Sequence, residues 1–223
     1  IANHALICTF GQVTAIFTLG FGLSPVLVSW AMTLPRAFDA VIDPALGHFS
    51  DDTHTRWGRR KPFLVFGAVF GALFLAGIWW ANRHWNPWLQ FVYLVTCTSL
   101  FYCCWGVYSM AWTAMGYELT DDYHERSRVQ GVAGIFLTLV LLGNGWIYWL
   151  ALRPVFGNEI VGIRWIAGII AVICVVTALV CVLTCKERFT QVNPRKTHVA
   201  LLPAMRATLR NRPFVILLLQ RLC

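Results

Sequence analysis

Apolar stretches long enough to cross a bilayer alternate with short polar segments along the whole chain. A helix needs about 20 apolar residues to cross the hydrocarbon core. Six stretches meet this requirement, and a further apolar run begins near Pro213. The predicted spans are residues 1–19, 25–49, 63–81, 88–116, 129–152 and 162–184. The pattern therefore predicts an all-α membrane protein built around a six-helix bundle.

Turn-forming and charged residues mark the connections between these spans. A short turn is expected at 20–24, and loops are expected at 50–62, 82–87, 117–128, 153–161 and 185–212. We expect three parts: the bundle at 1–184, a cytoplasmic linker with a short amphipathic helix at 185–212, and the start of a seventh helix at 213–223. The chain is expected to be truncated at both ends, with a missing C-terminal half as its partner.

The charge distribution decides how the net charge of +8 is interpreted. Only 13% of the residues are charged, against about 25% in soluble domains. Three basic residues, Arg83, Arg153 and Arg164, lie on one side of the predicted topology. Thirteen lie in loops on the other side: Arg56, Arg59, Arg60, Lys61, Arg126, Arg128, Lys186, Arg188, Arg195, Lys196, Arg206, Arg210 and Arg212. The bias places the N-terminus and the 185–212 linker in the cytoplasm of a multi-pass cell-membrane protein, and it argues against nucleic-acid binding.

The second span carries three ionisable residues, Arg36, Asp39 and Asp43, at spacings of three and four. On a helix these positions fall within about 60° of one another, so they share one face. Ionisable groups at membrane depth are costly and mark functional sites. Two carboxylates one turn apart can hold a cation or share a proton, which is the chemistry of a cation-coupled transporter. A simpler interpretation, an Arg36–Asp39 ion pair that only joins helices, leaves Asp43 unexplained.

The loop after this span is a compact charged hinge. Glycines permit close approach of helix ends, and arginines can pair with carboxylates across a moving interface. The acidic and basic residues near 117–128 are either a solvated loop or the other side of a cytoplasmic gate. The candidate gating residues are Arg36, Gly47, Asp51, Arg56, Gly58, Arg59, Arg60, Glu118 and Arg126.

Enzymatic chemistry is not indicated. The eight cysteines form no CxxC pair and no metal-ligand pattern with histidine. No nucleophile–base pair lies on a coherent face, so we expect no catalytic residue, no metal and no cofactor.

Several segments together resemble a known family. The segment from Asp39 through Asp43, Pro44 and Gly47 to Arg59 resembles the helix 2–3 region of the major facilitator superfamily, and more specifically of the glycoside–pentoside–hexuronide:cation symporters, the melibiose permease group. Weaker similarities follow at 112–118, 122–128 and 210–214. The resemblance implies the six-helix N-terminal half of a twelve-helix major facilitator fold.

The resemblance also implies roles for particular residues. Asp39 and Asp43 correspond to cation-binding carboxylates, for H⁺ or Na⁺. Asn3 and Ser109 stand where sugar-transporting members have acids, Ala133 lies near their helix 5 arginine, and Ile42 replaces a polar residue. The expected substrate contacts are Asn3, Ser109, Trp112 and Thr113; Gln12, Tyr108 and Asn144 are further polar or aromatic residues within reach of a sugar.

We therefore expect a secondary active transporter that couples a cation gradient to movement of a sugar or glycoside by alternating access. The expected partners are a small-molecule substrate, membrane lipid and the other half of the chain. Two alternatives stay open: a lysolipid or amphiphile transporter of the same fold, and a non-transporting membrane sensor or scaffold.

Overall fold

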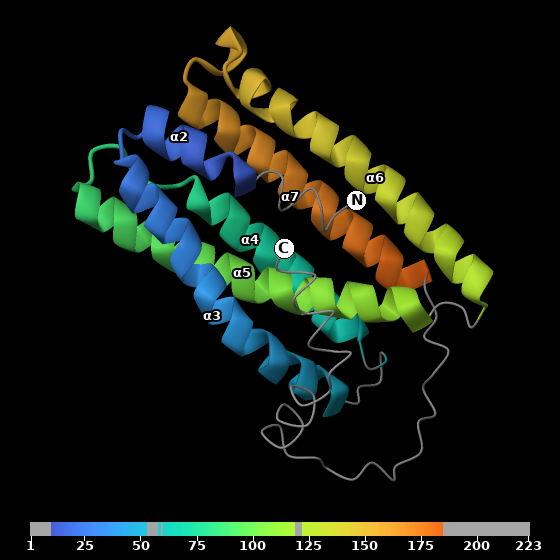
Figure 1. Ribbon diagram of the computed structural model, residues 1–223. Coiled ribbons are helices and arrows are strands. Elements are labelled where there is room, and N and C mark those ends of the chain that lie inside the picture. Colours follow the sequence, from blue (N-terminus) through green and yellow to red (C-terminus); the bar gives the residue numbers. More distant parts are fainter. Residues whose placement is uncertain (1–9, 53–57, 59, 119–121, 185–223) are drawn as a thin grey trace. The chain divides into compact units, whose positions relative to one another are not determined.

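The computed structural model describes residues 10–52, 58, 60–118 and 122–184; within these ranges the side chains of 39–41, 43–52, 117 and 118 are not described. The chain divides into two compact units, 1–188 and 189–223, and every described residue belongs to the first. The elements are α2 (Val13–Leu19), α3 (Pro25–Asp52), α4 (Lys61–Ile78), α5 (Pro87–Glu118), α6 (Tyr123–Ala151), the 3₁₀ turn η1 (Pro154–Phe156) and α7 (Glu159–Thr184) (Figure 1). The described part of the chain contains no strand, which confirms the all-α fold.

Four of these helices are long and apolar enough to cross a membrane: α4, α5, α6 and α7. They match four of the six predicted spans and make this a multi-pass membrane protein. The 28-residue α3 is long enough as well, but Arg36, Asp39 and Asp43 lower its mean hydropathy. The first predicted span is described only from Phe10, and the 185–212 linker and the 213–223 segment lie outside the described residues.

Two predicted loops are shorter than expected, because the helices beside them continue into polar sequence. α3 runs to Asp52 and α4 begins at Lys61, so Asp51 lies in a helix and not in the 50–62 loop. α5 ends at Glu118 and α6 begins at Tyr123, so Arg126 is also helical. The backbone N–H of His124 donates to Asp122 Oδ1 (3.0 Å), which satisfies one donor in the first turn and fixes this early start of α6.

The helices of this unit pack in a clear order. α5 lies between α3 and α4, α4 also packs against α7, and α6 packs mainly against α7; Figure 1 shows α6 beside α7. Apolar side chains at these helix contacts form the core. Among them, these are fully buried: Phe101 and Leu94 on α5, Leu64 and Leu75 on α4, and Ile163 on α7. α6 is the exception, since only Ala151 of that helix is buried.

A glycine lets α4 and α5 approach closely. A Cβ added to Gly67 would lie 2.7 Å from both the backbone N and the Cβ of Tyr108, and 2.8 Å from the carbonyl O of Cys104. Backbone atoms cannot move away without displacing the helix, so only glycine fits here. Gly71, one turn further along α4, faces a looser contact at 3.8 Å from Cys104 Cβ.

A proline determines how α3 is joined to α5. Pro35 has no N–H, so the carbonyl of Ala31 loses the helical hydrogen bond it would otherwise accept. The Thr98 hydroxyl of α5 reaches this carbonyl at 3.1 Å and also lies 2.8 Å from the carbonyl of Leu94 in its own helix. Both Ala31 and Thr98 are fully buried. The cross-helix bond therefore satisfies a polar group that would be costly to leave unpaired in an apolar interior.

We predict that Gly67→Ala destabilises the protein, because its methyl group meets backbone and not a flexible side chain. The expected cost is about 1–3 kcal/mol, as for other overpacked interfaces. The matched change Gly71→Ala has room for its methyl and gains helix propensity, so it is expected to be neutral or mildly stabilising. Thermal unfolding of the purified full-length protein in detergent measures both. Equal midpoints for the two variants would contradict the close-packing interpretation of Gly67.

A second prediction concerns the bond across the Pro35 position. Thr98→Val keeps the shape of the side chain and removes the donor to Ala31, so it should lower stability by about 1 kcal/mol, in the range of interhelical hydrogen bonds in membrane proteins. Thr96→Val is the matched control, because the exposed Thr96 hydroxyl donates only within its own helix, to the carbonyl of Val92 (2.8 Å). An unfolding midpoint for Thr98→Val no lower than that of Thr96→Val would refute the role of the cross-helix bond.

Candidate functional site

A cavity of about 450 Å³ lies where the segment before α2 meets α3 and α5. Its lining mixes apolar and polar side chains: Phe10 and Gly11, Met32, Thr33 and Arg36 from α3, and Tyr102 from α5. Phe10 packs against two rings of α5, stacked on Phe101 (centroids 5.1 Å apart) and edge-on to Tyr102 (5.0 Å). This volume and lining are typical of small-molecule sites, which combine apolar walls with a few placed polar groups.

Besides the Thr33 hydroxyl, the polar side-chain groups lining this cavity are those of Arg36 and Tyr102, which form a pair. The Arg36 Nε donates a hydrogen bond to the Tyr102 hydroxyl (3.1 Å), and its guanidinium carbon lies 5.8 Å from the centre of the Tyr102 ring. Tyr102 is buried, whereas Arg36 is exposed. A rigid buried ring therefore holds a charged group that still faces open space, which is the arrangement of a binding residue and not of a core ion pair.

The contacts of this pair also set the direction of the two helices. Ala31 meets Thr98 and, five residues later, Arg36 meets Tyr102, so α3 and α5 run parallel past this point. Seven residues beyond Arg36 lies Asp43, and seven beyond Tyr102 lies Ser109, in each case about 10 Å along its helix axis. Asp39 and Asp43 lie within α3, the helix that corresponds to the second predicted span; their side chains lie outside the described residues.

The predicted substrate contacts lie mainly on α5. Ser109 and Thr113 follow Tyr102 on the same helical face and are half-buried, as is Trp112. The Thr113 hydroxyl donates to the carbonyl of Ser109 (2.8 Å), which leaves its oxygen lone pairs as acceptors. Tyr108 is buried against Gly67 and belongs to the packing between helices. Asn3 lies outside the described residues, so its predicted contact stays a prediction.

An amide pair of one buried and one half-buried residue joins the segment before α2 to α6. The Gln12 Nε2 donates to Asn144 Oδ1 (2.7 Å), and it lies 3.2 Å from the Asn144 carbonyl. Gln12 is buried, beside the Gly11 that lines the cavity. These two residues were predicted as polar candidates, and the structure brings them together as a link between helices at the edge of the cavity.

Of the predicted gating residues, Arg36 lies in the middle of α3 and lines the cavity, whereas Arg60 and Arg126 lie near helix ends. Arg60 is the N-cap of α4, and Lys61 is its first residue. Gly58 has a φ of 112°, a conformation that side-chain-bearing residues rarely adopt. Arg60 and Arg126 are half-buried, and Gly58, Arg60 and Arg126 each make an interaction. Arg56 and Arg59 lie outside the described residues, as do the side chains of Asp51 and Glu118. Gly47 lies within α3.

The charges at these helix ends follow an unfavourable order within each helix. α3 ends on two carboxylates, Asp51 and Asp52, where the helix dipole is negative, and α4 begins with Arg60 and Lys61, where it is positive. Each of these charges destabilises the end of its own helix. The end of α3 therefore favours nearby positive charges, and the start of α4 favours nearby negative charges. The short connection between them brings complementary ends within one loop.

The sequence interpretation missed Tyr102, the residue that holds Arg36. Its signal was present as a tyrosine seven residues before Ser109 on one helix face, but it was hidden in a helix with many aromatic residues. Among the described residues no group of three or more His, Cys, Asp or Glu side chains is arranged to hold a metal ion.

Comparison with known proteins places the chain in a family. Residues 2–223 match the family described as MFS/sugar transport protein. An uncharacterised symporter of Synechocystis is 33% identical over 131 residues, which cover 54% of this chain and 24% of that protein. A glucuronide carrier protein homolog of Escherichia coli is 22% identical over 94% of this chain and 46% of its own length. A lactose permease of Lactobacillus helveticus is 27% identical over 73% of this chain and 27% of its own length.

The chain thus spans less than half the length of each of these relatives. The match to the family nonetheless covers almost every residue, and the helices and the charged α3 are those that the sequence resemblance led us to expect. The chain belongs to the major facilitator superfamily, as a member of the glycoside–pentoside–hexuronide:cation symporter family.

Proposed function

We propose that the full-length protein is a secondary active transporter that moves a sugar or glycoside across the cell membrane by alternating access, driven by an H⁺ or Na⁺ gradient. The observation that carries this proposal is the cavity between α3 and α5. There Tyr102 of α5 holds Arg36 of α3, and α3 also bears Asp39 and Asp43. The names of relatives as carriers, symporters and lactose permeases support it.

The coupling ion is assigned to Asp39 and Asp43. Two carboxylates one turn apart on a helix within the membrane would repel each other, and a bound Na⁺ or a shared proton removes that repulsion. The nearby Arg36 adds a fixed positive charge that disfavours an additional cation. Loading or release of one ion therefore changes the net charge of this face of α3, which makes it the coupling ion of this mechanism.

The sugar is assigned to the cavity and to the α5 face beyond it. Tyr102 supplies a ring and a hydroxyl, and Ser109, Trp112 and Thr113 extend the same helix with hydroxyl groups and an indole. Aromatic rings pack against the apolar faces of sugars, whereas hydroxyls and guanidinium groups bond their oxygens. Ser109 replaces an acid in the family pattern, so the substrate is expected to differ from a galactoside.

The charged helix ends are assigned to a cytoplasmic gate. Asp51 at the end of α3, Arg60 at the start of α4, Glu118 at the end of α5 and Arg126 in α6 would exchange partners as the two halves rock. The positive-inside distribution supports this placement, with the N-terminus and the 185–212 linker in the cytoplasm.

The coupling assignment predicts that Asp39→Asn and Asp43→Asn each abolish uphill accumulation of substrate by the full-length protein in proteoliposomes. Downhill flux should persist, because the amides keep the shape of the site and lose only the response to the ion. Glu187→Gln, the same chemical change in the predicted linker, should accumulate substrate like the wild type. A panel of monosaccharides, glycosides and glucuronides, tested with Na⁺ and pH gradients varied separately, identifies substrate and ion. Uphill accumulation by the double variant would refute the assignment, and the absence of flux for any substrate would favour a sensor.

The role of Tyr102 gives a further prediction. Tyr102→Phe keeps the ring and removes the acceptor that orients Arg36, so substrate affinity should fall about tenfold, in the range for hydrogen bonds to charged groups. Tyr148→Phe on α6 is the matched control and should leave affinity unchanged. Equilibrium binding of the transported sugar measures both. If Tyr102→Phe binds the sugar as tightly as the wild type, the hydroxyl does not position Arg36 for binding.

A further inference from the structure

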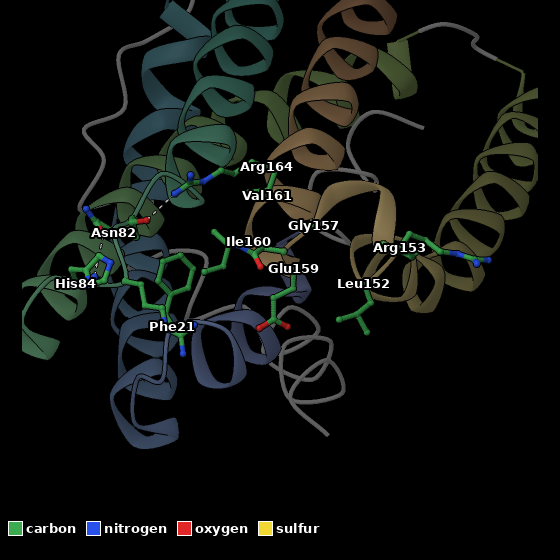
Figure 2. Close-up of a pocket in the computed structure, with 14 residues that line it drawn as sticks. Phe21, Asn82, His84, Leu152, Arg153, Gly157, Glu159, Ile160, Val161 and Arg164 are labelled. Carbon is green, nitrogen blue, oxygen red and sulfur yellow. Dashed lines mark hydrogen bonds between the residues drawn. The ribbon is translucent and has the colours of Figure 1, made fainter.

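Two cavities of different character meet at one end of the bundle, away from the α3–α5 cavity. One is an apolar groove of about 660 Å³ between the end of α4 and the start of α7. The other is a polar pocket of about 520 Å³, bounded by the turns after α2, α4 and α6 (Figure 2). Both are lined by Val161 and Arg164, so they adjoin along the first turns of α7.

The groove has the form of a site for an acyl chain. Trp80, two residues beyond the end of α4, and Trp165 of α7 line it and are each more than 60% exposed, and Ile169 and Val172 continue it along α7. Gly168 also lines the groove, and a Cβ added there would meet no atom within 4 Å. Both helices are candidate membrane spans. An exposed apolar groove on such helices is solvated by lipid tails, and the missing side chain makes this stretch deeper than its surroundings.

The polar pocket has an excess of positive charge. Its described lining contains three arginines, Arg83, Arg153 and Arg164, against one acid, Glu159. Arg153 stacks on Trp149, with its guanidinium carbon 3.6 Å from the ring centre, and Figure 2 shows it pointing away from Arg164. His84 lies on the same side of the pocket as Asn82 (Figure 2). The charge that faces the groove is therefore that of Arg164, with Arg83 in the neighbouring turn.

Arg164 is fixed where the two cavities join. Its Nε donates to the carbonyl of Trp79 (2.7 Å), and its Nη2 donates to the carbonyl of Ala81 (3.0 Å). These bonds hold the guanidinium in place beyond the end of α4. A guanidinium has five N–H groups, so donors remain for an anionic oxygen. The fixed positive charge lies where the apolar groove meets the polar pocket. A phospholipid has the matching order of groups, a charged headgroup followed by an acyl chain.

We propose that this composite site binds one phospholipid with an anionic headgroup: an acyl chain lies in the groove over Gly168, and the phosphate lies against Arg164 and Arg83. The tryptophans beside the groove belong to an aromatic belt, where headgroup and chain regions of the bilayer meet. This site is separate from the sugar and cation sites, and the lipid ties the end of α4 to α7.

Native mass spectrometry of the full-length protein tests this, with phosphatidylglycerol and phosphatidylcholine of identical chains as probes. The wild type should retain one phosphatidylglycerol in preference to phosphatidylcholine. Gly168→Leu fills the groove and should weaken phosphatidylglycerol binding about tenfold, the effect of leaving one or two methylenes unburied. Gly77→Leu is the matched control: Gly77 is also open to space, next to the groove residue Ala76 but outside the lining, and binding should be unchanged. Arg83→Gln should reduce the preference for the anionic lipid.

Three results would overturn the proposal. The first is that Gly168→Leu binds phosphatidylglycerol as tightly as the wild type, or that Gly77→Leu loses as much affinity for this lipid as Gly168→Leu. The second is equal retention of the two lipids by the wild type. The third is displacement of the lipid by millimolar inorganic phosphate, which would make the site one for a free anion. If Gly168→Leu does not purify as a folded protein, Trp165→Ala removes one wall of the groove, and its binding decides the question in the same way.

Discussion

The bond from Thr98 to the carbonyl of Ala31 is the constraint on which the described site depends. Pro35 removes the ordinary partner of that carbonyl, so α3 is stable in an apolar setting only when a neighbouring helix supplies a donor. The donor comes from α5, and this fixes the register between the two helices. Arg36 follows Pro35 directly and reaches Tyr102 one turn beyond Thr98. A single proline thus specifies both which helix packs against α3 and which side chain meets its arginine.

Small residues complete this arrangement on the other side of α5. Gly67 allows α4 to approach the backbone of α5, and Gly162 does the same for α7, where an added Cβ would collide with the carbonyl of Ala151 at the end of α6. Lipid tails are as apolar as the helices, so tight contact and hydrogen bonds hold a membrane bundle together more than exclusion of water does. Gly67 serves the contact between α4 and α5, and Gly162 serves the contact between α7 and the end of α6.

The sequence predicted the helices well and their ends poorly, for physical reasons. Long apolar runs have few alternatives in a bilayer, so α4, α5 and α7 were expected within about three residues of their observed bounds, whereas α6 begins about six residues earlier than expected. The ends depend on local hydrogen bonds, such as the cap that Asp122 provides, and a polar composition does not distinguish a helix end from a loop. The charged face of α3 was predictable from spacing alone. Its partner Tyr102 was not, because the pairing of α3 with α5 is tertiary and tyrosines are frequent in such helices.

The two hydrogen bonds from Arg164 have a mechanical consequence. They join the buried carbonyls of Trp79 and Ala81, just beyond the end of α4, to a charge carried by α7, so separating these helices breaks two charge-assisted bonds at once. At about 1.5–3 kcal/mol each, such bonds are much stronger than thermal energy. The ends of α4 and α7 are therefore expected to move together as one rigid body. α6 has few buried side chains by comparison, since only Ala151 of this helix is buried, and the Gln12–Asn144 amide pair ties it to the segment before α2.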